Sequence, residues 1–130
     1  MKKKIIAVLL AVVIFAICII PLSAFAETVI VMLSKTSSSK IQYSSSTVGV
    51  AKTANYDCSN SILSTGYACA RVQYAPAGGA FRNTSNPVLV VSPGDDATSS
   101  YTLLTVPSAY WRVAIWASGY VDSGNASVKI

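Results

Sequence analysis

Apolar and polar residues alternate with a period of two along most of the chain after residue 27. The clearest case is residues 110–117, where Trp111, Val113 and Ile115 fall on one side and Tyr110, Arg112 and Trp116 on the other. A period of two is typical of a β-strand with one buried face, and no stretch shows the 3.6-residue period of an amphipathic helix. The pattern predicts short strands at residues 28–34, 41–43, 47–54, 67–75, 88–91, 99–106, 110–117 and 126–130.

Turn-forming residues separate these runs. Residues 76–79 (Pro-Ala-Gly-Gly), 93–96 (Pro-Gly-Asp-Asp), 118–119 (Ser-Gly) and 122–125 (Asp-Ser-Gly-Asn) combine residues that favour turns. Seven to eight short strands at fairly regular spacing predict an all-β fold, a small antiparallel β-sandwich. The Ser/Thr-rich stretch from 34 to 47 is interpreted as a polar edge strand with loops, the alternative being a flexible linker.

The first 26 residues have the features of a cleavable signal peptide. Lys2, Lys3 and Lys4 precede an apolar run at residues 5–20, and Ala24 and Ala26 provide the small residues that a signal peptidase recognises. The run is shorter than the roughly 20 residues needed to cross a bilayer, which argues against an uncleaved anchor. The sequence therefore predicts a signal peptide at 1–26, a single secreted domain at 27–130 and no stable membrane span after cleavage.

Loss of the signal peptide changes the charge balance. The chain has 10 basic and 5 acidic residues; removing three lysines and no acids leaves seven against five, a net charge of +2. The remaining basic residues are scattered singly, whereas nucleic-acid binding needs concentrated positive charge. Nucleic acid is therefore excluded as a partner.

Two cysteines, Cys58 and Cys69, remain in the predicted mature domain. In an exported protein an even pair is most simply one disulfide, and a loop of about ten residues would add on the order of 2–3 kcal/mol of stability. The alternative is two buried free thiols. A metal site is disfavoured because the chain contains no histidine to complete a zinc shell.

The absence of histidine also removes the proton acceptor of Ser-His-Asp and Cys-His schemes. Asp95-Asp96 is the only pair of neighbouring acids, and its Pro-Gly-Asp setting is that of an ordinary solvated turn rather than half of a glycosidase pair or a calcium site. We therefore expect a protein that is not an enzyme and has no catalytic residues, cofactor or metal.

Tyrosine and tryptophan are the best candidates for a binding site, because each combines an apolar ring with a polar tip. If Trp111 faces the core, Tyr110, Arg112 and Trp116 share the opposite face, and Tyr120 follows just past the turn. These four residues form the predicted ligand platform. The alternative is that they are ordinary core and rim residues.

Together these features predict a secreted, extracellular, non-enzymatic β-sandwich of bacterial type, free or retained non-covalently at the cell surface. Its expected partner is an envelope polysaccharide or a surface protein. The alternatives are a bacteriocin- or toxin-like antagonist and a subunit that self-assembles through its Ser/Thr-rich edge. The oligomeric state does not follow from the sequence.

Overall fold

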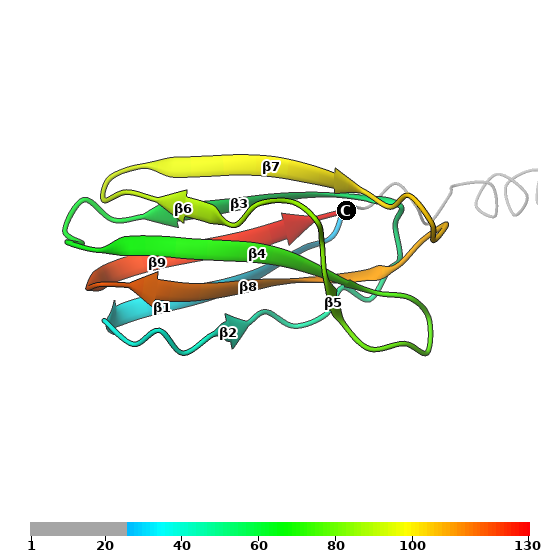
Figure 1. Cartoon of the computed structure of the whole chain (residues 1–130), viewed down its shortest axis with the longest axis horizontal. Coiled ribbons are helices and arrows are strands. Elements are labelled where there is room, and N and C mark those ends of the chain that lie inside the picture. The colour runs from blue at the N-terminus through cyan, green and yellow to red at the C-terminus, as the bar shows by residue number, and fades with distance from the viewer. Residues whose placement is uncertain (1–25) are drawn as a thin grey trace, which may run out of the picture.

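The computed structural model describes residues 26–130, which form nine strands in two antiparallel sheets packed face to face (Figure 1). The predicted all-β sandwich is confirmed. Residues 1–25 of the predicted signal segment, with Ala24, lie outside the described residues. The strands are β1 (Thr28–Thr36), β2 (Gln42–Tyr43), β3 (Thr53–Asn60), β4 (Tyr67–Ala75), β5 (Arg82–Asn83), β6 (Leu89–Val91), β7 (Asp96–Thr102), β8 (Tyr110–Ser118) and β9 (Val121–Lys129).

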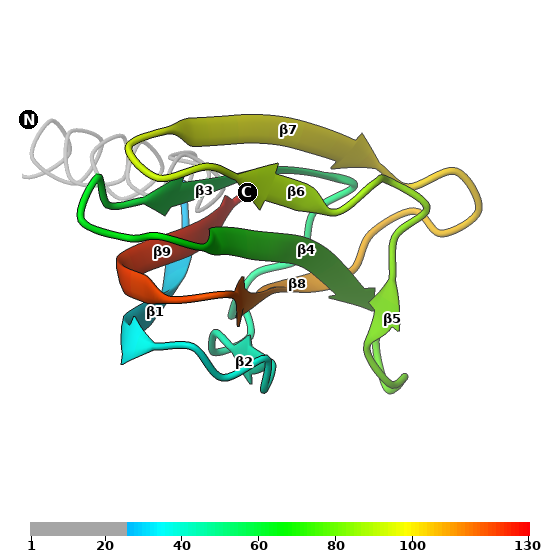
Figure 2. The ribbon, with the colours of Figure 1, turned by 60° about the vertical axis from the view of Figure 1, so that its left-hand side comes forward.

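The first sheet has the strand order β1-β9-β3-β7. The second has the order β2-β8-β4-β5, with β6 also paired to β4. Figure 2 shows the two sheets as separate layers, with β8 and β9 joined by a tight turn that passes from one layer to the other. No helix long and apolar enough to cross a bilayer occurs in the part of the chain that the structure describes.

The core lies between the two sheets and is built from every second residue of the long strands. Trp111, Val113 and Ile115 of β8 are fully buried. They pack with Val72 of β4 and with Val128 of β9 in one cluster. The alternation predicted for residues 110–117 is therefore confirmed, with Trp111 on the core side. Tyr74 and Tyr101 pack against the Trp111 ring, with centroid distances of 6.1 and 6.4 Å, favourable spacings for aromatic pairs.

The Ser/Thr-rich stretch forms a polar, irregular edge of the second sheet. Only Gln42 and Tyr43 pair as a strand, with Ile115 and Ala114 of β8. Beyond them the chain follows β8 through backbone hydrogen bonds from the N–H groups of Ser44, Thr47 and Ala51 to the carbonyls of Val113, Trp111 and Ala109, respectively. Their spacing of three and four residues is too long for a regular ladder, so hydroxyl groups complete the pairing. Val113 N–H donates to Ser44 Oγ, and Trp111 N–H donates to Thr47 Oγ1, both at 3.0 Å.

This irregular edge explains one wrong prediction. The strand expected at 47–54 overlaps β3 only at Thr53 and Ala54, and β3 continues to Asn60. The inward residues of β3 are Ala54, Tyr56, Cys58 and Asn60, all buried. These four side chains are not uniformly apolar, so the alternation of apolar and polar residues does not indicate a strand here.

The turn predicted at residues 122–125 is also wrong, because these residues lie inside β9. Gly124 pairs with Leu33 of β1 on one side and with Asn60 of β3 on the other. A Cβ atom on Gly124 would lie 3.1 Å from the Ser59 carbonyl oxygen and 3.5 Å from the Ala68 Cβ, so a small residue is needed at this position. Hydrogen bonds to two neighbouring strands therefore outweigh the local turn preference of Asp-Ser-Gly-Asn.

The expected disulfide is not formed: Cys58 and Cys69 are both free and buried. Cys58 points into the core from β3, whereas Cys69 lies between the core residues Ala68 and Ala70 and so faces outward from β4. The two side chains thus lie on different sides of the second sheet, which corrects the prediction of a Cys58–Cys69 bond. Desolvation raises the pKa of Cys58 to about 12, with smaller contributions from Cys69 and Asp57, and desolvation also raises the pKa of Cys69.

Candidate functional site

The outer face of the second sheet carries three of the four residues predicted for the ligand platform. Tyr110, Arg112 and Trp116 alternate with buried residues along β8 and are each half-buried. The register of β4 places outward-facing partners beside them, and β2 and the segment before β5 add aromatic rings. We call this surface the Arg112 face; it consists of Tyr43, Cys69, Arg71, Gln73, Phe81, Tyr110, Arg112, Ala114 and Trp116.

The guanidinium group of Arg112 lies between two aromatic rings. Its Cζ atom is 4.0 Å from the ring centroid of Tyr43 and 4.2 Å from that of Phe81. Both distances are well within the range of cation–π attraction, which favours the charged guanidinium over the ring faces. Tyr43 comes from β2 and Phe81 directly precedes β5, so two segments on opposite sides of β8 and β4 converge on this side chain.

Two consecutive hydrogen bonds through side-chain amides hold the Arg112 guanidinium in position. Arg112 Nε donates to Gln73 Oε1 at 2.8 Å, and Gln73 Nε2 donates to Asn83 Oδ1 at 2.8 Å. Gln73 stands opposite Arg112 in the β4–β8 register and opposite Asn83 in the β4–β5 register. One hydrogen bond at Nε leaves the terminal Nη groups of this five-donor side chain to an external acceptor.

A second guanidinium lies on the same face. Arg71 pairs with Ala114, two residues along β8 from Arg112, so the two arginines are diagonal neighbours across β4 and β8. The Nε atom of Arg71 is buried and has no hydrogen-bond partner among the described residues. The Arg112 face thus combines two positive charges with four aromatic rings and contains no carboxylate.

Tyr120, the fourth predicted platform residue, lies elsewhere. It belongs to the turn between β8 and β9, at the end of the sandwich, and its carbonyl accepts hydrogen bonds from the N–H groups of Thr65 and Gly66. Its hydroxyl donates to Asp122 Oδ1 at 3.3 Å. Partial desolvation, together with the charge and hydrogen bond of Asp122, raises the pKa of Tyr120 above its usual value.

Six members of the face were not predicted as part of the platform: Tyr43, Cys69, Arg71, Gln73, Phe81 and Ala114. The outward position of Arg71 and Gln73 was visible in the alternation of residues 67–75, but no local pattern relates them to Arg112. Tyr43 and Phe81 are 69 and 31 residues from Arg112 in the sequence, and only the strand order brings them together.

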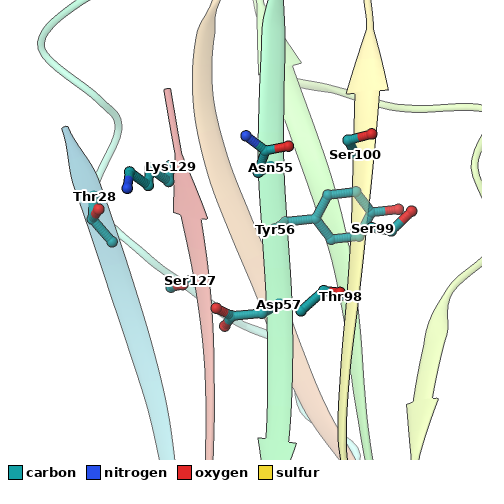
Figure 3. A pocket seen from close by; sticks show the side chains of 9 residues that line it. All are labelled: Thr28, Asn55, Tyr56, Asp57, Thr98, Ser99, Ser100, Ser127 and Lys129. Atoms are coloured by element: carbon teal, nitrogen blue, oxygen red, sulfur yellow. The ribbon is translucent and has the colours of Figure 1, made fainter. Parts of the chain in front are cut away.

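A second candidate surface is a shallow depression of about 480 Å³ on the outer face of the first sheet (Figure 3). It extends over β1, β9, β3 and β7 and is lined mainly by hydroxyl and amide groups, with the charged Asp57 and Lys129 among them. The aromatic residue in its lining, Tyr56, is buried in the core and is only 3% exposed. This surface therefore offers hydrogen bonds but no exposed ring on which a ligand could stack.

Metal-ligating side chains do not gather on either surface. No group of three or more His, Cys, Asp or Glu residues lies close enough to hold a metal ion within residues 26–130. Of the acids expected to form turns, Asp95 follows the Pro93-Gly94 turn and accepts a hydrogen bond from Asn60 N–H, and Asp96 begins β7. These residues thus have structural positions at the end of the sandwich.

No protein-family model matches this chain, and no curated protein matches it. Two solved structures with similarity to it are those of the infectious bursal disease virus Gx strain and Gt strain. The sequence identities are 12% and 15%, and the TM-scores are 0.44 and 0.43. Each match covers 82% of this chain but 32% and 33% of the viral chains, so this chain spans about a third of their length.

Proposed function

We propose that this protein is a non-catalytic binding module that acts outside the cell and holds an acidic polysaccharide on its Arg112 face. The observation that carries the proposal is the fixed position of the Arg112 guanidinium, between the rings of Tyr43 and Phe81 and hydrogen-bonded to Gln73. A side chain that is already held in place loses little further conformational entropy when a ligand binds, so more of the interaction energy contributes to affinity.

The charges and rings on the face determine the class of ligand. Guanidinium groups form paired, charge-assisted hydrogen bonds with carboxylate, sulfate and phosphate groups. The half-exposed rings of Tyr43 and Trp116 offer apolar surface to the flat faces of sugar rings. An acidic polysaccharide presents both features in every repeat, whereas a neutral glycan leaves Arg71 and Arg112 without a partner.

The Arg112 face supports this role better than the depression on the first sheet does. The depression contains Asp57 and Lys129 among neutral polar groups and lacks an exposed ring. A carboxylate there would repel an anionic ligand, while the Arg112 face carries positive charge alone. The complete absence of histidine, together with the positions of Asp95 after a turn and of Asp96 at the start of β7, supports a role in binding rather than in catalysis.

The proposal is tested by affinity electrophoresis and calorimetry of residues 26–130 with alginate, a polymer of uronic acids, and with neutral dextran. We expect retention by alginate only, weakening as salt is added because the contacts are charge-assisted. Arg112→Gln keeps a flexible, polar side chain but removes the charge, and it should weaken binding at least about tenfold.

Lys129→Gln is the matched control, because it removes one positive charge from the opposite sheet. It should change affinity by less than about twofold, since its charge is screened from the Arg112 face. Equal losses of alginate affinity in Arg112→Gln and Lys129→Gln would show that binding depends on net charge and not on the Arg112 face. Absence of retention on alginate and on a sulfated polymer such as dextran sulfate would refute the proposed function.

A further inference from the structure

The first sheet ends in a long open edge at β1. Among the described residues, β1 pairs with β9 on one side and with no strand on the other. The edge strands of the second sheet are short: β2 and β5 have two residues and β6 has three. β7, the opposite edge of the first sheet, begins with Asp96 and has Thr98, Ser100 and Thr102 on its outer face.

Residues 28–34 of β1 lack the features that normally keep an edge strand from pairing, and the first charged residue of the strand is Lys35, whose φ is 43°. Charged residues, proline and bulges protect exposed edges, and residues 28–34 contain no charge and no proline. Ile30 and Met32 on the outer face are 58% and 65% exposed. Val29 and Val31, which face the core, are only partly buried because the sandwich is open along this edge.

The hydrogen-bond pattern identifies which backbone groups are free. Ile130 N–H donates to the Glu27 carbonyl at 3.0 Å, so the backbone groups of Glu27 point toward the β9 side. In an antiparallel pair, the backbone N–H and C=O groups of successive residues point alternately toward the partner strand and away from it. Thr28, Ile30, Met32 and Ser34 therefore direct their N–H and C=O groups to the open edge.

We propose that β1 pairs with β1 of a second copy of this chain, antiparallel and centred on Val31. This register places Ile30 opposite Met32 of the partner subunit, and both residues have free backbone groups, so the ladder can form. The four exposed apolar side chains then lie together on one face. Just beyond each end of the regular pairing, Lys35 of one copy comes near Glu27 of the other, and their opposite charges attract.

The resulting sheet has eight strands, continuous through the two-fold axis. Because paired residues point to the same face, both copies present their first sheets on one side and their Arg112 faces on the other. A polymeric ligand would then meet two sites at once. The dimer itself does not depend on the proposed function, because it is detected by mass rather than by ligand binding.

Sedimentation velocity of residues 26–130, which contain all nine strands, tests the dimer over a series of concentrations. We expect a reversible shift from monomer to dimer as concentration rises. Met32→Lys should weaken association at least about tenfold, because it brings ammonium groups into the apolar pairing. Thr98→Lys adds the same charge at the opposite edge, on β7, and should leave association unchanged.

The register is tested by single cysteine substitutions. Val31 meets its own copy at the two-fold axis as a pair without direct hydrogen bonds, for which Cα atoms are about 4.5 Å apart, close enough for a disulfide. Val31→Cys should therefore cross-link under mild oxidation, and Val29→Cys should not. A monomer at every concentration, a dimer unaffected by Met32→Lys, or cross-linking of Val29→Cys rather than Val31→Cys would overturn the proposal.

Discussion

Gly66 packs directly against the backbone of Gly119. A Cβ atom on Gly66 would lie 2.4 Å from the carbonyl carbon of Gly119 and 2.6 Å from the carbonyl oxygen of Ser118. Gly66 N–H donates to the Tyr120 carbonyl at 2.7 Å, and Gly119 has a φ of 89°, which glycine adopts without strain. This contact joins the β3–β4 loop to the β8–β9 turn and closes one end of the sandwich.

Gly66→Ala should therefore destabilise the fold by about 2–3 kcal/mol, because the added methyl group forces two backbone segments apart. Urea denaturation followed by tryptophan fluorescence would measure the change. Gly49→Ala is the control, since a Cβ there meets its nearest neighbours at 3.4 and 3.5 Å. Equal stability of the Gly66→Ala and Gly49→Ala proteins would contradict the close contact.

Thr47 provides the acceptor for a buried backbone donor of β8. Its Oγ1 accepts from Trp111 N–H at 3.0 Å and donates to the Gly49 carbonyl at 2.8 Å. Thr47→Val keeps the shape but leaves the Trp111 N–H unpaired, which should cost about 1–3 kcal/mol in the free energy of unfolding.

The control for this substitution is Thr53→Val. The side-chain hydroxyl of Thr53 bonds only to the exposed hydroxyl of Thr102, and water can replace that partner. Thermal unfolding should place Thr53→Val within about 0.5 kcal/mol of the original protein. A Thr47→Val protein with unchanged stability would show that the hydroxyl is not needed by β8.

The Glu27 carboxylate anchors the start of β1 to the irregular edge. It accepts hydrogen bonds from the N–H groups of Val48 at 2.6 Å and Gly49 at 2.9 Å. Glu27→Ala should lower the free energy of unfolding by about 1 kcal/mol, since water can partly replace an exposed acceptor. Glu27→Gln keeps one acceptor oxygen and should fall between the two proteins. Faster amide exchange at Val48 and Gly49 in Glu27→Ala would be the specific readout, and unchanged exchange would contradict the anchor.

The free thiol of Cys58 should make stability decrease in alkaline solution. Its pKa is raised from 9.0 to about 12 by burial, so the folded state holds the proton after the unfolded chain has lost it. The stabilising contribution is complete below the unfolded pKa and is lost as pH rises toward the folded one, at up to about 1.4 kcal/mol per pH unit.

Chemical denaturation at a series of pH values from about 8 to about 10 measures this slope. Cys58→Ala removes the thiol and should reduce the slope, whatever its effect on stability at neutral pH. Thiol titration should find Cys58 and Cys69 unreactive in the folded protein and reactive after unfolding, because both are buried. An equal slope in the Cys58→Ala protein would contradict the assignment.

Strands with a strong contrast between apolar and polar positions were predicted from the sequence more accurately than strands without it. β4 and β8 combine strong alternation with flanking turn residues, and both were predicted almost to their ends. β3 buries Ala, Tyr, Cys and Asn, which give little contrast with its polar residues, so residues 55–60 of this strand were missed. The Asp-Ser-Gly-Asn segment of β9 has the local chemistry of a turn, and its strand conformation depends on two neighbours that are distant in sequence.

The candidate site shows the same division. Alternation along β8 correctly put Tyr110, Arg112 and Trp116 on the face opposite Trp111. It could not exclude Tyr120, because the chain turns into the other sheet immediately before that residue. It also could not indicate Tyr43 or Phe81, whose contacts with Arg112 depend on the order of strands.

The sequence alone determined that this chain forms β-strands and which side of its strongest strand is apolar, because both follow from side chains two residues apart. Tertiary structure decided the strand order and with it every contact made across strands: the rings on either side of Arg112, the separation of Cys58 from Cys69, and the open edge at β1. These features depend on hydrogen bonds and packing between segments far apart in the chain. Local alternation contains no information about which segments become neighbours.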